Sequence, residues 1–357
     1  MSDQDFQILK ELPTRLEQSQ CVSHKHEIII CGGAGERACY SYHITKNEYK
    51  FICEYPKIVK LDGHCVVKLV DNNKDSNQIT LLSFGSIYGG KYKHTSVMKY
   101  VSVWSNISDK SNELNNYNQW IPFTDNHNHP IIIETYKCEF EGARAVIGGS
   151  NNHLLFITYK HNNISVFDLN TFQFITDIHL PINYNYISYH CFVSTSENGQ
   201  GQEMMKANEE KNRQNYQMLL FCFNAGLSIE YYEDNNTFQF QKLPVCDDIV
   251  PFISYGYICI NDVILFFGGR GDSVSKSVHK YSIRENKWTT FKNALPSPLY
   301  DCVAILSEED NYIHIIGGRN GNGKIVSTHM KTNVRVWDHS QLVMICLFIC
   351  FDEPNLY

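Results

Sequence analysis

The chain has 357 residues, of which 43% are hydrophobic and 19% are charged, so it can form a large buried core and is not disordered as a whole. The formal net charge of -7 argues against general attraction to nucleic acid or to an anionic membrane surface. The 22 Tyr and 20 Phe residues, together with many β-branched residues, favour β-sheet over helix.

The N-terminal segment, residues 1–11, carries acidic residues and no apolar core of the kind that a secretory signal needs, so we expect a cytoplasmic protein. The 13 cysteines are scattered singly without a Cys-x-x-Cys pair, which is typical of reduced thiols. The longest apolar run, residues 342–351, has about ten residues, roughly half the length needed to span a bilayer as a helix. We therefore expect no membrane-spanning segment.

An apolar strand that ends in glycine recurs along the chain. Three copies end in a diglycine, at residues 28–33, 264–269 and 313–318. Three weaker copies, at residues 81–85, 154–159 and 219–224, keep the strand with one glycine or none. We place Gly148 and Gly149 in the turn before the third of these six repeats, because the strand that follows aligns better with the diglycine strands.

A pair of aromatic residues separated by a turn rich in Asn and Asp follows five of these strands. In four repeats the two aromatic residues are seven positions apart, and in the second repeat a polar insertion lies between them. The pairs are Tyr42 with Tyr49, Tyr100 with Trp120, Phe167 with Phe174, Tyr231 with Phe238, and Tyr281 with Trp288.

The diglycine followed by spaced Tyr and Trp residues resembles the kelch repeat. This resemblance covers residues 6–338 and implies an all-β fold: a six-bladed kelch-type β-propeller with four antiparallel strands in each blade. The physical chemistry agrees, because one small sheet cannot bury both of its faces, whereas a closed ring of six can. Cys21, Cys65, Cys191 and Cys302 occupy similar places ahead of the glycine strands, where small side chains suit crowded inner strands.

The two chain ends are expected to meet in one blade. Residues 6–13 resemble residues 238–244, which form an outermost strand in the repeat pattern, while the sixth repeat offers only three strands of its own. We therefore predict that residues 6–12 complete the sixth blade by backbone hydrogen bonds. The polar insertions at residues 106–119 and 194–217 are expected to be surface loops, and the apolar tail at 339–357 has no counterpart in the repeat.

Three kinds of short motif resemble functional sites but do not fit them in their sequence context. Residues 33–38 fit a dinucleotide-binding fingerprint formally, but the residues that follow alternate as a strand where that motif needs a helix. The Arg-Gly-Asp tripeptide at 270–272 is interpreted as a turn. The pairs His24-x-His26 and His127-x-His129 have no Cys or acidic partner at a known metal spacing, so we interpret them as loop histidines and predict neither a metal site nor a cofactor.

Basic residues gather in the segments that follow the glycine strands. In kelch propellers these segments share one face around the central channel, and here eight cations face two acids, which gives a local charge of eight minus two, or +6. Arginines beside tyrosines suit the capture of carboxylate or phosphate groups. The candidate partner-binding residues are Arg37, Lys91, Tyr92, Lys93, His94, Tyr186, Tyr255, Arg270, Tyr300 and Arg319. The other cations counted are Lys160, Lys276 and Lys324, and the opposing acids are Glu36 and Asp272.

These features predict a non-enzymatic protein-interaction module or scaffold, monomeric and cytoplasmic, which binds a partner protein or acidic peptide through its basic loop face. No nucleophile motif, phosphate loop or paired-carboxylate motif indicates an enzyme. The alternative from another class is a propeller oxidase similar to galactose oxidase. That chemistry needs copper and a Tyr-Cys crosslink near two histidines, and no local pattern in this chain joins those residue types.

Overall fold

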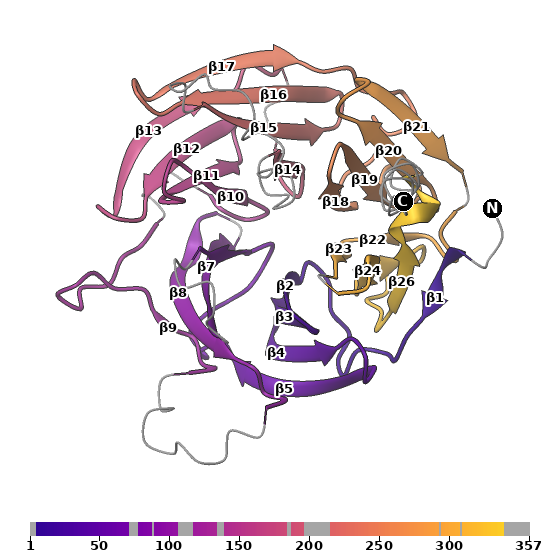
Figure 1. Cartoon of the computed structure of the whole chain (residues 1–357), viewed down its shortest axis with the longest axis horizontal. Helices are drawn as coiled ribbons and strands as arrows, with labels where there is room; N and C mark the ends of the chain where they lie inside the picture. The colour runs from indigo at the N-terminus through magenta and orange to yellow at the C-terminus, as the bar shows by residue number, and fades with distance from the viewer. Residues whose placement is uncertain are drawn as a thin grey trace, which may run out of the picture.

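Six four-stranded antiparallel sheets surround a central axis in the computed structural model of this chain (Figure 1). The structure describes residues 5–70, 78–87, 89–105, 117–133, 139–183, 187–195, 215–292, 294–307 and 309–338. The fold is therefore an all-β propeller with six blades, as predicted. Most of the insertions at 106–119 and 194–217, and all of the tail at 339–357, lie outside the described residues.

Each blade runs from an innermost to an outermost strand. Blade 1 consists of β2 (Gln20–His24), β3 (Glu27–Gly33), β4 (Glu36–His43) and β5 (Glu48–Glu54). Blade 2 consists of β6 (Cys65–Leu69), β7 (Gln78–Ile87), β8 (Lys91–Val101) and β9 (Ile121–Pro122). Blade 3 consists of β10 (Arg144–Gly148), β11 (Leu154–Tyr159), β12 (Asn163–Asp168) and β13 (Gln173–His179).

The second half of the ring repeats this order. Blade 4 consists of β14 (Cys191–Ser194), β15 (Asn215–Cys222), β16 (Ala225–Tyr232) and β17 (Thr237–Lys242). Blade 5 consists of β18 (Gly256–Ile260), β19 (Val263–Phe267), β20 (Val278–Ser282) and β21 (Lys287–Phe291). Blade 6 consists of β23 (Val303–Leu306), β24 (Tyr312–Ile316), β26 (His329–Asn333) and β1 (Gln7–Ile8). A small sheet of β22 (Leu299–Tyr300) and β25 (Arg319–Asn320) and the 3₁₀ turn η4 (Val334–Val336) complete the described elements.

The N-terminal strand closes the ring, as predicted. Strand β1 lies at the outer edge of blade 6 and pairs antiparallel with β26 (Figure 1). Only Gln7 and Ile8 form the strand, so it is shorter than the predicted 6–12. Beyond it, the amide of Leu9 donates to the His329 carbonyl at 2.9 Å and the amide of Leu12 to that of Ser327 at 3.0 Å. The predicted backbone pairing of the two chain ends is therefore present, although part of it lies outside regular strand.

Four of the five predicted aromatic pairs face each other across the third and fourth strands, whereas Trp120 of the fifth stacks on Tyr55 instead of Tyr100. The pairs with a spacing of seven are direct register partners, with ring centroids 4.9 to 5.1 Å apart. In three blades the tyrosine hydroxyl also donates to an Asn side chain in the turn, and each Asn has a positive φ. These pairs are Tyr42 with Asn47, Tyr231 with Asn236, and Tyr281 with Asn286. The aromatic spacing is therefore the sequence signature of a hairpin.

The hydrophobic core is divided into clusters that lie between neighbouring blades. The cluster between blades 5 and 6, for example, joins Leu265, Ile315 and Trp337, and Phe6 of the N-terminal segment packs on Trp337 with ring centroids 5.8 Å apart. Similar clusters fill each of the other blade interfaces. Burial between blades explains why isolated blades would not persist.

Two glycines allow the close approach of loops from neighbouring blades. A Cβ atom on Gly268 would lie 2.0 Å from the Leu299 carbonyl oxygen, and one on Gly317 would lie 2.5 Å from that of Leu16. Both glycines also have positive φ angles, of 68° and 64°. The second strand of each of these blades ends against the connection between two blades, and only glycine leaves room for that contact.

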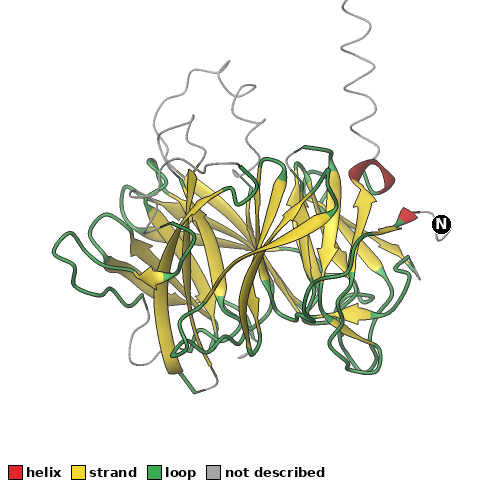
Figure 2. Cartoon of the chain, turned by 90° about the horizontal axis from the view of Figure 1, so that it is seen from below, coloured by secondary structure: helices red, strands yellow, loops and turns green. Residues whose placement is uncertain are grey.

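Loops and turns border the disc on its two faces (Figure 2). The antiparallel order places the loops after the second strands on the same face as the connections between blades, and the other hairpin turns on the opposite face. Among the described residues, no helix has the length and apolarity needed to cross a membrane.

Candidate functional site at the mouth of the central channel

One residue in each blade, two positions before the innermost strand, has a left-handed backbone conformation. We call these six residues the channel ring: Gln18, Gly63, Gly142, Tyr189, Ser254 and Asp301, with φ angles of 51°, 60°, 68°, 52°, 55° and 53°. Glycine adopts such angles freely, whereas a bulky residue does so at a cost in free energy. The ring therefore concentrates unusual backbone geometry where the connections between blades enter the channel.

Backbone hydrogen bonds link neighbours in the channel ring. In each bond, the amide of one ring residue donates to the carbonyl of the ring residue in the preceding blade. The bonds are Gln18 to Asp301 at 2.9 Å, Asp301 to Ser254 at 2.7 Å, Tyr189 to Gly142 at 2.8 Å, and Gly142 to Gly63 at 2.9 Å. Because these bonds join different blades, they fix the positions of the ring side chains relative to one another.

The ring of Tyr189 covers the two glycines of the channel ring. A Cβ atom on Gly63 would lie 2.5 Å from Tyr189 Cε1, and one on Gly142 would lie 2.9 Å from the Tyr189 amide nitrogen. The Tyr189 hydroxyl donates to Asp62 Oδ1 at 3.2 Å and lies 3.4 Å from Glu141 Oε1. The two glycines thus leave the space that the tyrosine needs in order to lie across blades 2 and 3.

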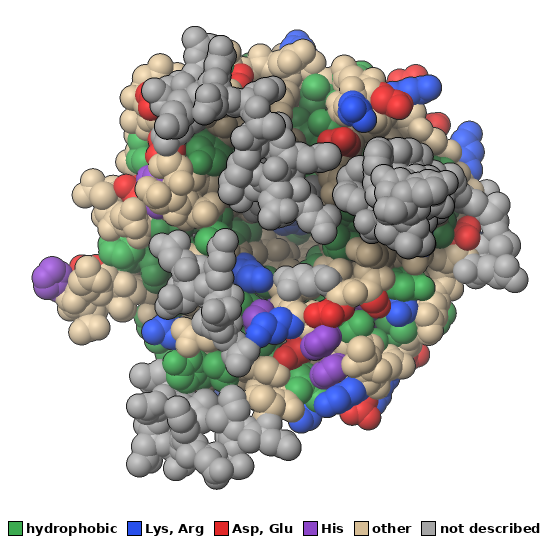
Figure 3. Space-filling model, viewed as in Figure 1, with side chains coloured by type: hydrophobic (Ala, Val, Ile, Leu, Met, Phe, Trp, Pro, Cys, Tyr) green, Lys and Arg blue, Asp and Glu red, His purple; other side chains and the backbone are tan. Residues whose placement is uncertain are grey.

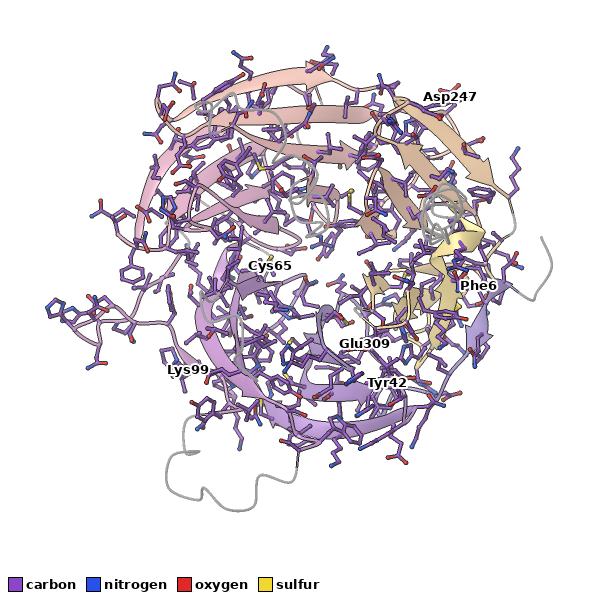
Figure 4. All side chains as sticks on the ribbon, in the orientation of Figure 1. Phe6, Tyr42, Cys65, Lys99, Asp247 and Glu309 are labelled. Atoms are coloured by element: carbon purple, nitrogen blue, oxygen red, sulfur yellow. The ribbon has the colours of Figure 1, made fainter. Side chains whose placement is uncertain are left out.

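Two cavities share the four side chains of the channel ring. The outer cavity has a volume of about 550 Å³ and is also lined by Pro251, Ile253, Tyr300 and residues 270–272. The inner one has a volume of about 190 Å³ and follows the innermost strands, where it is lined by Arg144, Tyr257 and Cys65. Cys65 lies beside the open centre of the disc (Figure 4). We call the two cavities together the channel mouth.

Arginines and tyrosines meet at the channel mouth. The Arg270 guanidinium lies over the Tyr300 ring, 5.4 Å from its centroid, and that of Arg144 lies 5.9 Å from the centroid of Tyr189. Arg144 also donates to the Ala143 carbonyl at 2.9 Å. In the part of the chain that the structure describes, neither guanidinium forms an ion pair. Both cations are therefore available to an anionic ligand.

The Asp301 carboxyl group lines both cavities of the channel mouth, and that of Asp62 lies beside it, hydrogen-bonded to Tyr189. Burial raises the pKa of Asp301 to about 6, and the nearby Glu17 adds to this shift, whereas a hydrogen bond with Ser254 opposes it. Burial, followed by the charge of Glu141, also raises the pKa of Asp62. These carboxyl groups are consequently protonated more readily than exposed ones, which reduces their repulsion of an anion.

The structure brings some of the predicted site residues together and separates others. Arg270 and Tyr300 line the outer cavity. Lys91 and Tyr92 are exposed and Lys93 is half-buried in the hairpin between β7 and β8. Tyr255 is buried and donates to the Phe221 carbonyl at 2.8 Å, and burial lowers the pKa of the buried His94 to about 4. Tyr186 lies outside the described residues.

Three of the eight predicted cations are paired with acids from other segments. Arg37 pairs with Glu54 at 2.8 Å, and Arg319 forms a two-pronged pair with Glu17. Lys160, whose side chain is only 2% exposed, contacts Glu141 at 2.6 Å and Glu139 at 3.4 Å. The predicted charge of +6 counted only the loops after the glycine strands. The connections between blades lie on the same face and carry Glu17, Glu139 and Glu141, whereas Glu54 is the last residue of β5.

Sequence reasoning missed Gln18, Arg144, Tyr189 and Asp301, although the sequence carried a signal for Tyr189 and Asp301. The recurrent cysteines at 65, 191 and 302 mark the innermost strands, and the channel-ring residue lies one or two positions before each of them. Aligning the repeats on these cysteines would have placed Gly63 and Tyr189 at equivalent positions, with Asp301 one position away from theirs.

The residue types that a copper oxidase would need also occur together, in the core between blades 1 and 2. Tyr55 stacks on Trp120 with centroids 4.6 Å apart, and the rings of His64 and His94 lie 5.8 Å and 6.1 Å from Tyr55. Trp120 Nε1 donates to Cys39 Sγ at 3.3 Å. The Nδ1 atoms of both histidines are buried and lack a hydrogen-bond partner among the described residues. All five side chains are buried.

Comparison with known proteins identifies the fold but no family. No family model matches the chain, and no curated protein matches it. Among solved structures, the one titled "Structure of YjhT" matches with a TM-score of 0.61 and 16% sequence identity, and the match covers 92% of this chain and 98% of that one. At this level of identity the likeness shows a shared propeller fold alone.

Proposed function

We propose that this chain is a kelch-type propeller that acts as a non-enzymatic recognition module, and that its channel mouth binds an acidic side chain of a partner protein or peptide. The observation that carries this proposal is Arg270, an exposed cation that is stacked on Tyr300 at the rim of the outer cavity and has no ion pair among the described residues. An arginine held on an aromatic ring loses little conformational freedom when it binds a carboxylate in a bidentate manner.

The inner arginine adds to this argument. Arg144 lies deeper in the channel, also on an aromatic ring, and its positive charge partly opposes the rise in the pKa of Asp301 that burial causes. An acidic ligand that enters the mouth therefore meets cations at two depths, with Tyr189 between the outer and inner cavities. A cavity of about 550 Å³ has room for a few side chains of a peptide.

The test compares short acidic peptides with the same peptides in which Asp and Glu are replaced by Asn and Gln. We expect the wild type to prefer the acidic set, and Arg270→Glu to weaken binding by at least about 10-fold, because one charge of a close pair is reversed. Lys287→Glu makes the same charge change on the exposed outer strand β21 and should leave binding unaltered. Equal binding of neutral and acidic peptides, or full binding by Arg270→Glu, would contradict the proposal.

A copper-dependent oxidase is the second candidate, and the cluster of Tyr55, His64 and His94 favours it. Phenol and imidazole groups are ligands that copper accepts, and Cys39 lies beside Trp120, which stacks on the tyrosine. Elemental analysis of the purified protein separates the two candidates. Stoichiometric copper that is lost in His64→Ala would support the oxidase. A protein that is purified without copper, and whose stability does not change when copper is added, would support the recognition module.

A further inference from the structure

The segment between β9 and β10 carries three potential metal ligands on one tight turn. It projects from the rim of the disc at the left of Figures 1 and 3, and Figure 3 shows histidine at its outer end. One ligand atom each from Asp125, His127 and His129 lies within 4.8 Å of the other two. Both histidines are exposed and Asp125 is half-buried. The sequence predicted no acidic partner at a known metal spacing for the His127-x-His129 pair, but Asp125, two residues before it, places a carboxylate beside both rings.

The backbone of this turn holds the ligands in place before any ion binds. The amide of Asp125 donates to the His129 carbonyl at 3.0 Å, and the amide of Asn128, which has a φ of 62°, donates to the Asp125 carbonyl at 3.1 Å. Asp125 Oδ1 accepts from the amides of His127 and His129, both at 2.8 Å. Because Oδ1 is occupied by these two bonds, Oδ2 is the oxygen that remains for a ligand.

Asp125 and His129 already lie at nearly the distance that separates two ligand atoms of one metal ion. Asp125 Oδ2 lies 3.1 Å from His129 Nδ1, and the rings of His127 and His129 stack with centroids 6.0 Å apart and planes 24° apart. In a tetrahedral zinc site with bonds of 2.0 to 2.1 Å, two ligand atoms are about 3.3 Å apart. The ion would therefore fit between Oδ2 and Nδ1 with little movement of this pair.

We propose that Asp125, His127 and His129 bind one divalent zinc ion, with water in the fourth position. Two imidazoles and one carboxylate favour a borderline transition metal over Mg²⁺ or Ca²⁺, which prefer oxygen ligands. Three protein ligands on an exposed turn leave one side of the ion open, so the fourth position is accessible to water or to a group from another molecule. This site lies apart from the channel mouth and does not depend on the function proposed there.

Titration calorimetry of the full chain with ZnCl₂ tests this site. We expect one zinc ion to bind per chain, seen as a stoichiometry of one in the binding isotherm. His127→Ala/His129→Ala should abolish this binding, and Asp125→Asn should weaken it at least about 10-fold while its amide oxygen can still accept the two backbone bonds. Visible absorption of the Co²⁺-substituted protein reports whether the coordination is tetrahedral.

The matched control is His161→Ala/His179→Ala, which removes two other exposed histidines and should bind zinc like the wild type. Zinc that binds the His127→Ala/His129→Ala protein as tightly as the wild type would place the ion elsewhere, for instance on thiols, and would overturn the proposal. Mg²⁺ binding as tight as Zn²⁺ binding, or an absence of zinc binding, would overturn it as well. Unchanged thermal unfolding of the metal-free variants confirms that they are folded.

Discussion

Closure of the ring predicts that one buried side chain near the N-terminus stabilises the whole propeller. Phe6 is 7% exposed and packs on Trp337 within the core shared by blades 5 and 6. Truncation of a buried Phe to Ala typically costs about 3 to 5 kcal/mol. Because Phe6 lies near a chain end, where the surrounding structure can adjust, we expect the lower limit of about 3 kcal/mol for Phe6→Ala.

Urea unfolding measures this loss. With a slope of about 3 kcal/mol/M, Phe6→Ala should lower the midpoint by about 1 M. Ile8→Ala is the matched control, because Ile8 lies on the same short strand but is 64% exposed, and such surface changes usually stay within about 0.5 kcal/mol. Deleting residues 1–12 should destabilise the protein further, since the buried Leu12 is also lost. If Phe6→Ala unfolds at the same midpoint as Ile8→Ala, the terminal segment does not hold the ring closed.

Two further predictions concern the glycine turns and the buried histidines. In urea unfolding, Gly268→Ala should lower the free energy of unfolding by at least about 1 kcal/mol more than the control Gly35→Ala does. Gly35 has a similar φ of 73°, but the space around its Cβ position is open. Equal losses in the two variants would contradict this prediction. Burial lowers the pKa of His94, His279 and His314 to about 4, so the unfolded chain binds more protons below pH 6.5. The contribution of these histidines to the free energy of unfolding is complete above this pH and falls toward pH 4. At pH 5 the loss is about 2 kcal/mol for each histidine. The raised pKa of Asp301 opposes this loss by about 1 kcal/mol. Thermal unfolding that is independent of pH between 7 and 5 would refute this prediction.

The blade architecture could be predicted from the sequence because its signals are local. Tyr281 and Trp288 are seven residues apart because the hairpin between β20 and β21 makes them direct partners. Asn286, with a φ of 52°, accepts a hydrogen bond from Tyr281 and forms part of that turn. Each element of this pattern lies within one hairpin, so one repeat contains the information that specifies it.

The sequence predicted that the N-terminal segment closes the ring, but not how many of its residues form a strand. The likeness between residues 6–13 and 238–244 identified an outer strand, yet only Gln7 and Ile8 form one. The later residues Leu9 and Leu12 bond to carbonyls at His329 and Ser327, where β26 begins and the chain before it curves away from regular strand. The length of β1 is thus set by a segment more than 300 residues away, about which residues 6–12 carry no local signal.

The charge of the loop face was not predictable from the repeat because its neutralising partners come from different blades. Glu17 precedes blade 1 and Arg319 follows the second strand of blade 6, yet the two side chains form a partly buried pair across the closure. A count within one type of loop includes the arginine and omits the glutamate. The net charge of one face of a propeller must therefore be counted over the loops after the second strands and over the connections between blades, because ring closure brings distant residues into contact.

The channel ring links the fold to the proposed function. Tyr189 and Asp301 adopt positive φ angles that cost free energy, and hydrogen bonds from their own amides to neighbouring blades help to hold them there. That geometry places the Tyr189 ring against Arg144 and a carboxyl group of raised pKa between the two cavities. The same contacts that join the blades thus fix the side chains of the channel mouth before a ligand arrives, and a rigid mouth binds with a smaller loss of conformational entropy than a mobile loop would.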